Sequence, residues 1–181
     1  MTSLTSLSDY EKFVELQSNL YRATFSLKLF GLSYPLAVFL IHIPTTKDCI
    51  LIDAVDPENV MKLSETLDSH FKLFPEYKLK YMAITHGHFD HTGALPKLLN
   101  DYKDVKVIMG DAEIPFVVNG KKYQELDGDT LTFQLLKRFG KESEVILNED
   151  KVVTIKESRE HEFEFYDILK PIFTVGHTPG E

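Results

Sequence analysis

The chain has 181 residues, of which 43% are hydrophobic and 27% are charged, and its formal net charge is −8. This length predicts one domain with its own core, and this composition excludes a chain that is disordered throughout. The acidic balance, without a dense run of Lys or Arg, argues against a nucleic-acid partner, because phosphate backbones repel negative charge.

Residues 1–24 are predicted to form an N-terminal helical extension, because apolar residues recur at helical spacing over 9–22. Farther along the chain, short apolar runs bounded by turn residues predict strands at 24–30, 35–43, 49–53, 80–85, 105–109, 152–155, 163–165 and 172–175. Periodic apolar residues predict helices at 56–70, 92–100 and 131–139. Strands that alternate with helices favour the α/β class with a layered sheet.

The pairing of 35–43 with 49–53 is expected to be a hairpin, since turn residues separate the two runs. The sequence lacks a secretory signal at its start, and its longest apolar stretch, of about ten residues, is shorter than the ~20 that span a bilayer. Cys49 is the only cysteine, so we expect a small buried strand residue rather than a disulfide or a thiolate metal cluster. These features predict a cytoplasmic protein that does not enter membranes.

Four side chains that can bind metals follow the strand predicted at 80–85: His86, His88, Asp90 and His91. In an extended segment, residues two apart point to the same side, so His86 and His88 can converge on one ion. Asp90 and His91 follow after the chain turns toward the next helix and can reach a second ion. Imidazoles with a carboxylate suit zinc, and iron and manganese also accept them. The spacing therefore predicts a metal site.

The sequence His86-Gly87-His88-Phe89-Asp90-His91 resembles the His-x-His-x-Asp-His signature of the metallo-β-lactamase superfamily. Three further segments occur in the family's order: 51–54, 110–113 and the Gly-His-Thr-Pro-Gly motif at 176–180. The resemblance runs from about Phe25 to the last residue and is weakest over 114–165. It implies an αββα sandwich of two sheets between helices, with residues 25–181 as the metallo-β-lactamase-like domain.

The resemblance also implies a set of metal ligands. A first metal would be held by His86, His88 and His177, and a second partly by Asp90 and His91. Asp90 is also the residue that we expect to act in catalysis, by orienting a water molecule and passing a proton to the leaving group.

Asp53 lies where the family has an aspartate ahead of the signature. We expect it either to support a metal ligand from behind or simply to form a turn. The family commonly continues with a small residue and glycine, whereas Ala54 and Val55 follow here. The geometry of this turn is therefore open.

Five other titratable residues lie outside the ligand set. Asp111 and Glu113 are expected to be surface or loop-capping carboxylates. His42, His70 and His161 are expected at the surface or as core residues with satisfied hydrogen bonds.

The family takes a bridging aspartate and a last histidine from segments that follow the Gly-His-Thr-Pro-Gly motif. Only residues 178–181 follow His177 in this sequence, and none of them is a candidate for either ligand. We therefore expect the C-terminal half of the sandwich to be largely absent, and the site to form well for at most one zinc ion. An uncovered sheet face is expected to favour association.

The resemblance implies a hydrolase that uses a zinc-activated water. A small ester, thioester or lactone is the expected substrate, since the net charge of −8 disfavours polyanions. Two alternatives stay open. The chain could be a non-catalytic or inactive fragment that binds a metal or a partner, or a mononuclear iron enzyme that carries out oxidation at the first site.

Overall fold

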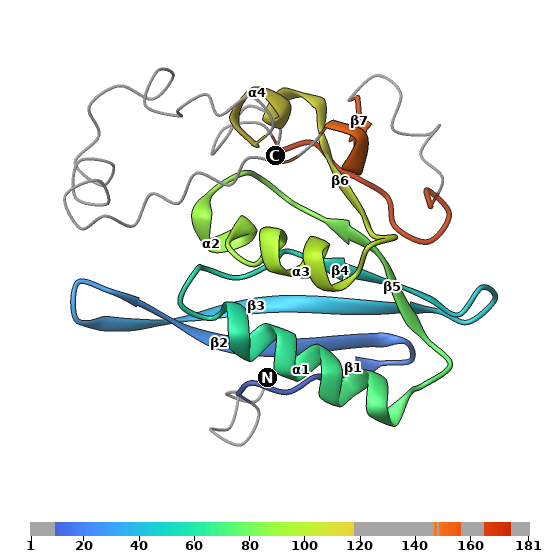
Figure 1. The fold of residues 1–181 in the computed structure, drawn as a ribbon, viewed down its shortest axis with the longest axis horizontal. Helices are drawn as coiled ribbons and strands as arrows, with labels where there is room; N and C mark the ends of the chain where they lie inside the picture. Colours follow the sequence, from blue (N-terminus) through green and yellow to red (C-terminus); the bar gives the residue numbers. More distant parts are fainter. Residues whose placement is uncertain (1–9, 118–146, 148, 157–164, 175–181) are drawn as a thin grey trace.

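The structure is a computed structural model that describes residues 10–117, 147, 149–156 and 165–174. These residues form a seven-stranded sheet whose strands are ordered in space as they are in the sequence (Figure 1). The strands are β1 (Val14–Gln17), β2 (Leu20–Leu29), β3 (Leu32–Ile43), β4 (Asp48–Ile52), β5 (Lys78–Ala83), β6 (Lys106–Gly110) and β7 (Val152–Ile155). Neighbours from β1 to β4 pair antiparallel, and neighbours from β4 to β7 pair parallel. The α/β class and the strand regions predicted between 24 and 109 are confirmed.

The helix predicted over 9–22 is wrong, because this segment forms β1 and the start of β2. The two strands are joined by a two-residue turn in which Asn19 adopts a left-handed backbone conformation with φ of 67°. Asparagine tolerates this conformation better than most residues. Tyr21, Ala23 and Phe25 then alternate onto one buried face. The apolar residues of this segment fit the period of two of a strand as well as helical spacing, and the turn at Asn19 is compatible only with the strands. The division of the chain at residue 24 stays a prediction, although β2 runs through it.

The hairpin predicted from 35–43 and 49–53 is confirmed as the pair β3 and β4, in register from Ile43 with Asp48 to Phe39 with Ile52. Cys49 lies on β4 and is fully buried, as predicted.

The helices are α1 (Val60–Leu73), α2 (Phe89–Thr92), α3 (Leu95–Asp101) and α4 (Ile114–Val117), with single 3₁₀ turns η2 (Asp111–Glu113) and η3 (Glu149–Lys151). The helix predicted from residue 56 begins four residues later. Asp56 forms a turn instead, accepting a hydrogen bond from the Glu58 amide at 2.8 Å through its side chain and from the Asn59 amide at 3.1 Å through its carbonyl. The helix predicted over 92–100 is α3, which begins three residues later at Leu95, and the short helix α2 precedes it.

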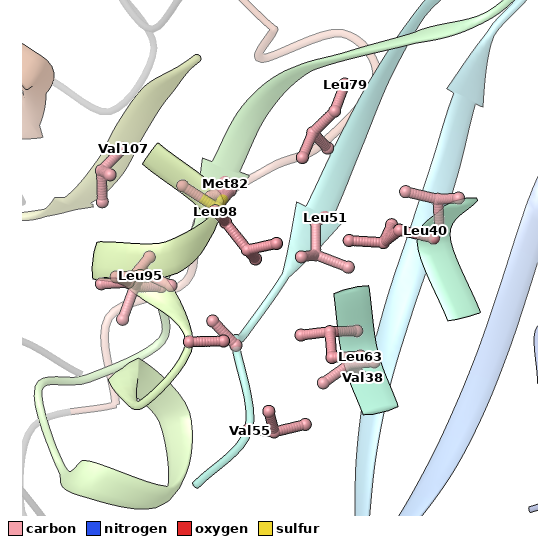
Figure 2. Packing of buried hydrophobic residues seen from close by; sticks show 14 of the residues in the cluster. Val38, Leu40, Leu51, Val55, Leu63, Leu79, Met82, Leu95, Leu98 and Val107 are labelled. Atoms are coloured by element: carbon pink, nitrogen blue, oxygen red, sulfur yellow. The ribbon is translucent and has the colours of Figure 1, made fainter. Parts of the chain in front are cut away.

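The main core lies between the sheet and its helices. Figure 1 shows α1 and α3 across the same face of the sheet, and Figure 2 shows Leu63 of α1 and Leu95 and Leu98 of α3 pointing toward the strands. All three leucines are fully buried. The opposite face carries a smaller cluster made of Ile43, Ile50, Tyr81, Ile108, Ile155 and Phe165.

Two histidines join α1 to the sheet inside the main core. His42 of β3 and His70 of α1 are both buried, and their Nε2 atoms lie 2.8 Å apart. Aromatic rings surround the pair, including Tyr21, Phe74 and a stacked Tyr77. For these two histidines the prediction of satisfied core residues is confirmed, whereas His161 lies outside the described residues.

The C-terminal predictions fare differently. The strand predicted at 152–155 is β7. Phe165, predicted to end a strand, lies in a turn, because its carbonyl accepts hydrogen bonds from the amides of Ile168 and Leu169. Residues 172–174 are coil, and in the described chain they have no strand partner. The predicted helix at 131–139 and residues 163, 164 and 175 lie outside the described residues. No helix that the structure describes is long and apolar enough to cross a membrane.

Candidate metal centre

The four predicted ligands between 86 and 91 lie on the loop that follows β5 and on the first turn of α2. In the sheet β5 lies between β4 and β6 and runs parallel to both. The carboxyl ends of the three strands therefore meet at one edge, which brings Asp53, the motif loop (85–88) and Glu113 together.

Asp53 follows β4 and is buried. Its Oδ1 accepts hydrogen bonds from the Thr85 amide at 2.9 Å and from the Thr85 hydroxyl at 3.0 Å. Its Oδ2 lies 2.9 Å from Nδ1 of His91. Since the carboxylate occupies Nδ1, Nε2 is the nitrogen through which His91 could bind a metal. A carboxylate behind a ligating histidine fixes both the tautomer and the ring orientation. These contacts favour the prediction that Asp53 supports a candidate ligand, His91, over the alternative that it only forms a turn.

The turn after Asp53 is built on left-handed backbone. Asp53 has a φ of 62° and Val55 a φ of 45°. This conformation is strained for a β-branched residue such as Val55, and the hydrogen bonds around it hold it. The Val55 carbonyl accepts a hydrogen bond from the Gly93 amide at 2.8 Å. The Ala54 amide donates to the His91 carbonyl, and the Ala54 carbonyl accepts from the Ala94 amide, both at 2.8 Å. These hydrogen bonds fix the turn to residues 91–94, which follow the motif loop, and so hold Val55 in a conformation that glycine adopts more easily.

Gly93 is needed where this turn meets the segment between α2 and α3. A Cβ atom at residue 93 would lie 2.5 Å from the backbone carbon of Asp56 and 2.5 Å from the backbone nitrogen of Pro57. Only a residue without a side chain allows this approach. The amides of Gly93 and Ala94 donate hydrogen bonds to this turn, which explains why α3 begins only at Leu95 and is separate from α2.

The imidazoles of the motif are close neighbours. The ring centroid of His86 lies 4.8 Å from that of His88 and 4.1 Å from that of His91. His86 is buried, with Nδ1 at 3.1 Å from the Thr85 hydroxyl, so Nε2 is its candidate ligand atom. Asp90 lies in the first turn of α2, and its Oδ2 is 3.7 Å from Nε2 of His91.

His88 has a second, backbone role at the start of α2. Its carbonyl accepts the amides of His91 at 3.0 Å and Thr92 at 3.1 Å, and also the Thr92 hydroxyl at 3.0 Å. These bonds fix the point at which the chain leaves the motif loop for the helix.

The structure thus places four of the five predicted ligands on residues 86–91, with the ring of His86 next to those of His88 and His91 and Asp90 beside His91. Within the residues described, no three His, Cys, Asp or Glu side chains converge as a complete metal-binding group. His177, predicted as the third ligand of the first metal, lies outside the described residues, and its role stays a prediction.

Glu113 differs most from its sequence-based prediction as a surface or loop-capping carboxylate. It is fully buried, and its Oε2 accepts the Gly87 amide at 2.9 Å. Of the two expected settings, loop capping is correct and surface exposure is wrong, whereas Asp111 is exposed. The position of Glu113 could have been predicted from the parallel strands, because Glu113 follows β6, the strand next to β5, and so lies at the same edge of the sheet as the motif.

The donor chemistry of the site fits zinc. Neutral imidazoles and a carboxylate are zinc's ordinary nitrogen and oxygen ligands. The hydrogen bonds to Nδ1 of His86 and His91 leave Nε2 on each ring as the candidate donor. The same set also suits iron or manganese.

An open cavity of about 320 Å³ adjoins the motif loop at the carboxyl edge of the sheet. Strand ends form one wall and residues 169–174 form the other. Its lining is mainly apolar and includes Ile52, Ala83, Thr85, Ile108, Ile155 and Phe173.

Comparison with known proteins gives concordant results. A family profile described as "Metallo-beta-lactamase superfamily" matches residues 34–181. The chain is 30% identical over 155 residues to "Probable metallo-hydrolase YflN" of Bacillus subtilis (strain 168), covering 83% of this chain and 56% of that protein. It is 32% identical over 94 residues to "Hydroxyacylglutathione hydrolase cytoplasmic" of Arabidopsis thaliana, covering 52% of this chain and 32% of that protein.

A solved structure of a metallo-β-lactamase with a HARLDQ motif, from Cronobacter sakazakii, has the same fold, with a TM-score of 0.63 and 18% identity. The superposition covers 93% of this chain and 55% of that one, so the chain spans about half the length of that protein. The predicted metallo-β-lactamase fold class is confirmed. Together with the histidine motif at the carboxyl edge of the sheet, the match over 34–181 shows that the chain belongs to the metallo-β-lactamase superfamily.

Proposed function

We propose that this protein is a metal-dependent hydrolase whose centre is built on His86, His88, Asp90 and His91, with His177 as a further ligand. The observation that supports this most directly is the close approach of three imidazole rings, with His91 held from behind by Asp53. Zinc, when bound, supplies Lewis acidity and a water whose pKa is about 7.

The chain's own residues prepare the site for such chemistry. Asp53 and the Thr85 hydroxyl fix the rings of His91 and His86 by their Nδ1 atoms, so both rings keep one orientation before a metal arrives. Asp90, whose side chain is 25% exposed, can accept a proton at Oδ2 and release it to a leaving group. This combination favours hydrolysis over simple metal storage.

For the substrate, we propose a small ester, thioester or lactone. The mainly apolar cavity beside the motif loop suits the acyl part of such a molecule. The net charge of −8 disfavours polyanions. One relative is named a hydroxyacylglutathione hydrolase, which makes acylated thiols the first substrates to test.

A panel of short-chain thioesters, esters and lactones tests the proposal on zinc-loaded protein. We expect turnover of at least one class, and a loss of about 100-fold or more in kcat/KM in His88→Ala, because removing a metal ligand removes the activating ion. Asp111→Ala, on the exposed side of η2, is the matched control and should keep full activity.

Two outcomes would count against a hydrolase. Zinc-loaded protein without turnover on any class would favour a protein that binds metal but does not catalyse hydrolysis. Turnover that is unchanged in His88→Ala would show that the activity does not come from this centre.

A further inference from the structure

We infer that Glu113 is a positioning residue for the metal centre: its buried carboxylate holds the peptide between His86 and His88, and so fixes the spacing of two ligands. This inference rests on the proposed function, since it concerns the geometry of the same centre. Glu113 would not itself bind the metal or touch the substrate.

The motif loop depends on side chains for its backbone hydrogen bonds. Residues 85–88 belong to neither β5 nor α2, so neither the sheet nor the helix orients their amides. The Thr85 amide donates to Asp53 and the Gly87 amide donates to Glu113, both at 2.9 Å. Two alternate amides of the loop are therefore held by two carboxylates.

The sheet explains why these two carboxylates face the loop from opposite sides. Asp53 follows β4 and Glu113 lies just past β6, whereas the motif loop follows β5, which lies between them. All three strands are parallel, so their carboxyl ends meet at one edge. Burial of Glu113 shields its hydrogen bond to the Gly87 amide from competing water, which strengthens the bond.

Loss of this bond should weaken metal binding without removing any ligand. If the Gly87 peptide can rotate, the rings of His86 and His88 must be ordered by the metal itself, at a cost in affinity. Outer contacts of this kind typically change metal affinity by about 10–100-fold.

The test separates the reach of the side chain from its charge. Glu113→Gln keeps the length and an acceptor oxygen but removes the charge, whereas Glu113→Asp keeps the charge but is too short to reach Gly87. Zinc affinity is measured by competition with a chromophoric chelator, and the visible spectrum of the cobalt-loaded protein reports the coordination. Asp111→Ala, two residues away on the same 3₁₀ turn and exposed, is the matched control.

Positioning through the hydrogen bond predicts that Glu113→Gln binds zinc within about threefold of wild type. Glu113→Asp should bind about 10–100-fold more weakly, with an altered cobalt spectrum. Wild-type affinity and spectrum in a folded Glu113→Asp protein would overturn the inference while leaving the proposed function intact. Equal weakening in both variants would also overturn it, because charge alone would then be responsible. A wild-type chain that binds no zinc would instead overturn the proposed function, and this inference with it.

Discussion

Asp53, Thr85 and Glu113 hold the loop that carries the candidate metal ligands, although none of the three is itself a predicted ligand. Asp53 contacts both Thr85 and His91, and Glu113 contacts Gly87 between two histidines. The candidate ligands were predictable from the spacing of residues 86–91 and, for His177, from the family resemblance. These supporting contacts were not, because they join residues that are 26 to 38 positions apart in the chain.

Gly93 gives a test of how tightly the turn after Asp53 is packed behind the motif. Gly93→Ala places a Cβ atom 2.5 Å from the backbone at Asp56 and Pro57, where no flexible side chain can move aside. We expect the free energy of unfolding to fall by about 2–3 kcal/mol, as for overpacked cores. Urea unfolding measures this change.

Gly31→Ala is the control for Gly93→Ala. Gly31 has a φ of 77° and nothing within 4 Å of an added Cβ atom, so the control reports backbone strain alone. Its expected cost is about 1 kcal/mol. Equal costs for the two variants would contradict the close approach at Gly93.

Among the secondary structure elements, most of the predicted strands and helices before Gly110 occur in the structure, because hydrophobic runs bounded by turn residues identify them locally. The errors lie where local pattern left two solutions. At 14–22 the same apolar residues fit a helix or a hairpin, and the left-handed turn at Asn19 favours the hairpin. At 172–174 apolar composition favoured a strand, but no neighbouring strand pairs with it among the described residues. Strand formation depends on a partner that sequence pattern does not reveal.

The junction between α1 and β3 should be sensitive to acid. Burial lowers the pKa of His70 to about 4, and it also lowers the pKa of His42 from its usual 6.5. The groups that face the pair are Glu15, Glu76, Lys47, Tyr21, Tyr77 and Cys49, together with the surrounding aromatic rings. The two carboxylates partly oppose the shift at His42, but burial is the largest cause.

Both histidines are therefore neutral in the folded protein at a pH where the unfolded chain already binds protons. Stability that is present above about pH 6.5 should be lost as the pH falls toward 4, because the unfolded state takes up more protons over this range. His70 alone should lower the free energy of unfolding by about 2 kcal/mol between pH 6.5 and 4.5.

Urea unfolding at a series of pH values tests this expectation. The double variant His42→Phe with His70→Phe keeps two rings in the aromatic cluster and removes both titrating groups. Its stability should fall less steeply between pH 6.5 and 4.5 than that of the wild type. Parallel pH profiles would show that the pair does not control acid stability.

The whole molecule places different surfaces on the two faces of its sheet. Helices α1 and α3 cover one face with the main core (Figure 1), whereas the other carries the smaller cluster and the cavity beside the motif loop. The chain spans 56% of the length of its Bacillus subtilis relative. The association predicted through the second face stays a prediction. Within the described residues, the loop that carries the predicted ligands His86, His88 and His91 is held by hydrogen bonds to the carboxylates of Asp53 and Glu113.

Zinc stoichiometry and affinity of the purified protein test the central claim most directly. They are best measured by equilibrium titration on wild type, His86→Ala, His88→Ala and His177→Ala. We predict about one tightly bound zinc ion per chain in the wild type, and at least tenfold weaker binding in each variant, since each removes one of three ligands. Folded wild-type protein without bound zinc would contradict the claim that this loop forms a metal centre in the chain. Binding that is unaffected by His86→Ala and His88→Ala would contradict it equally.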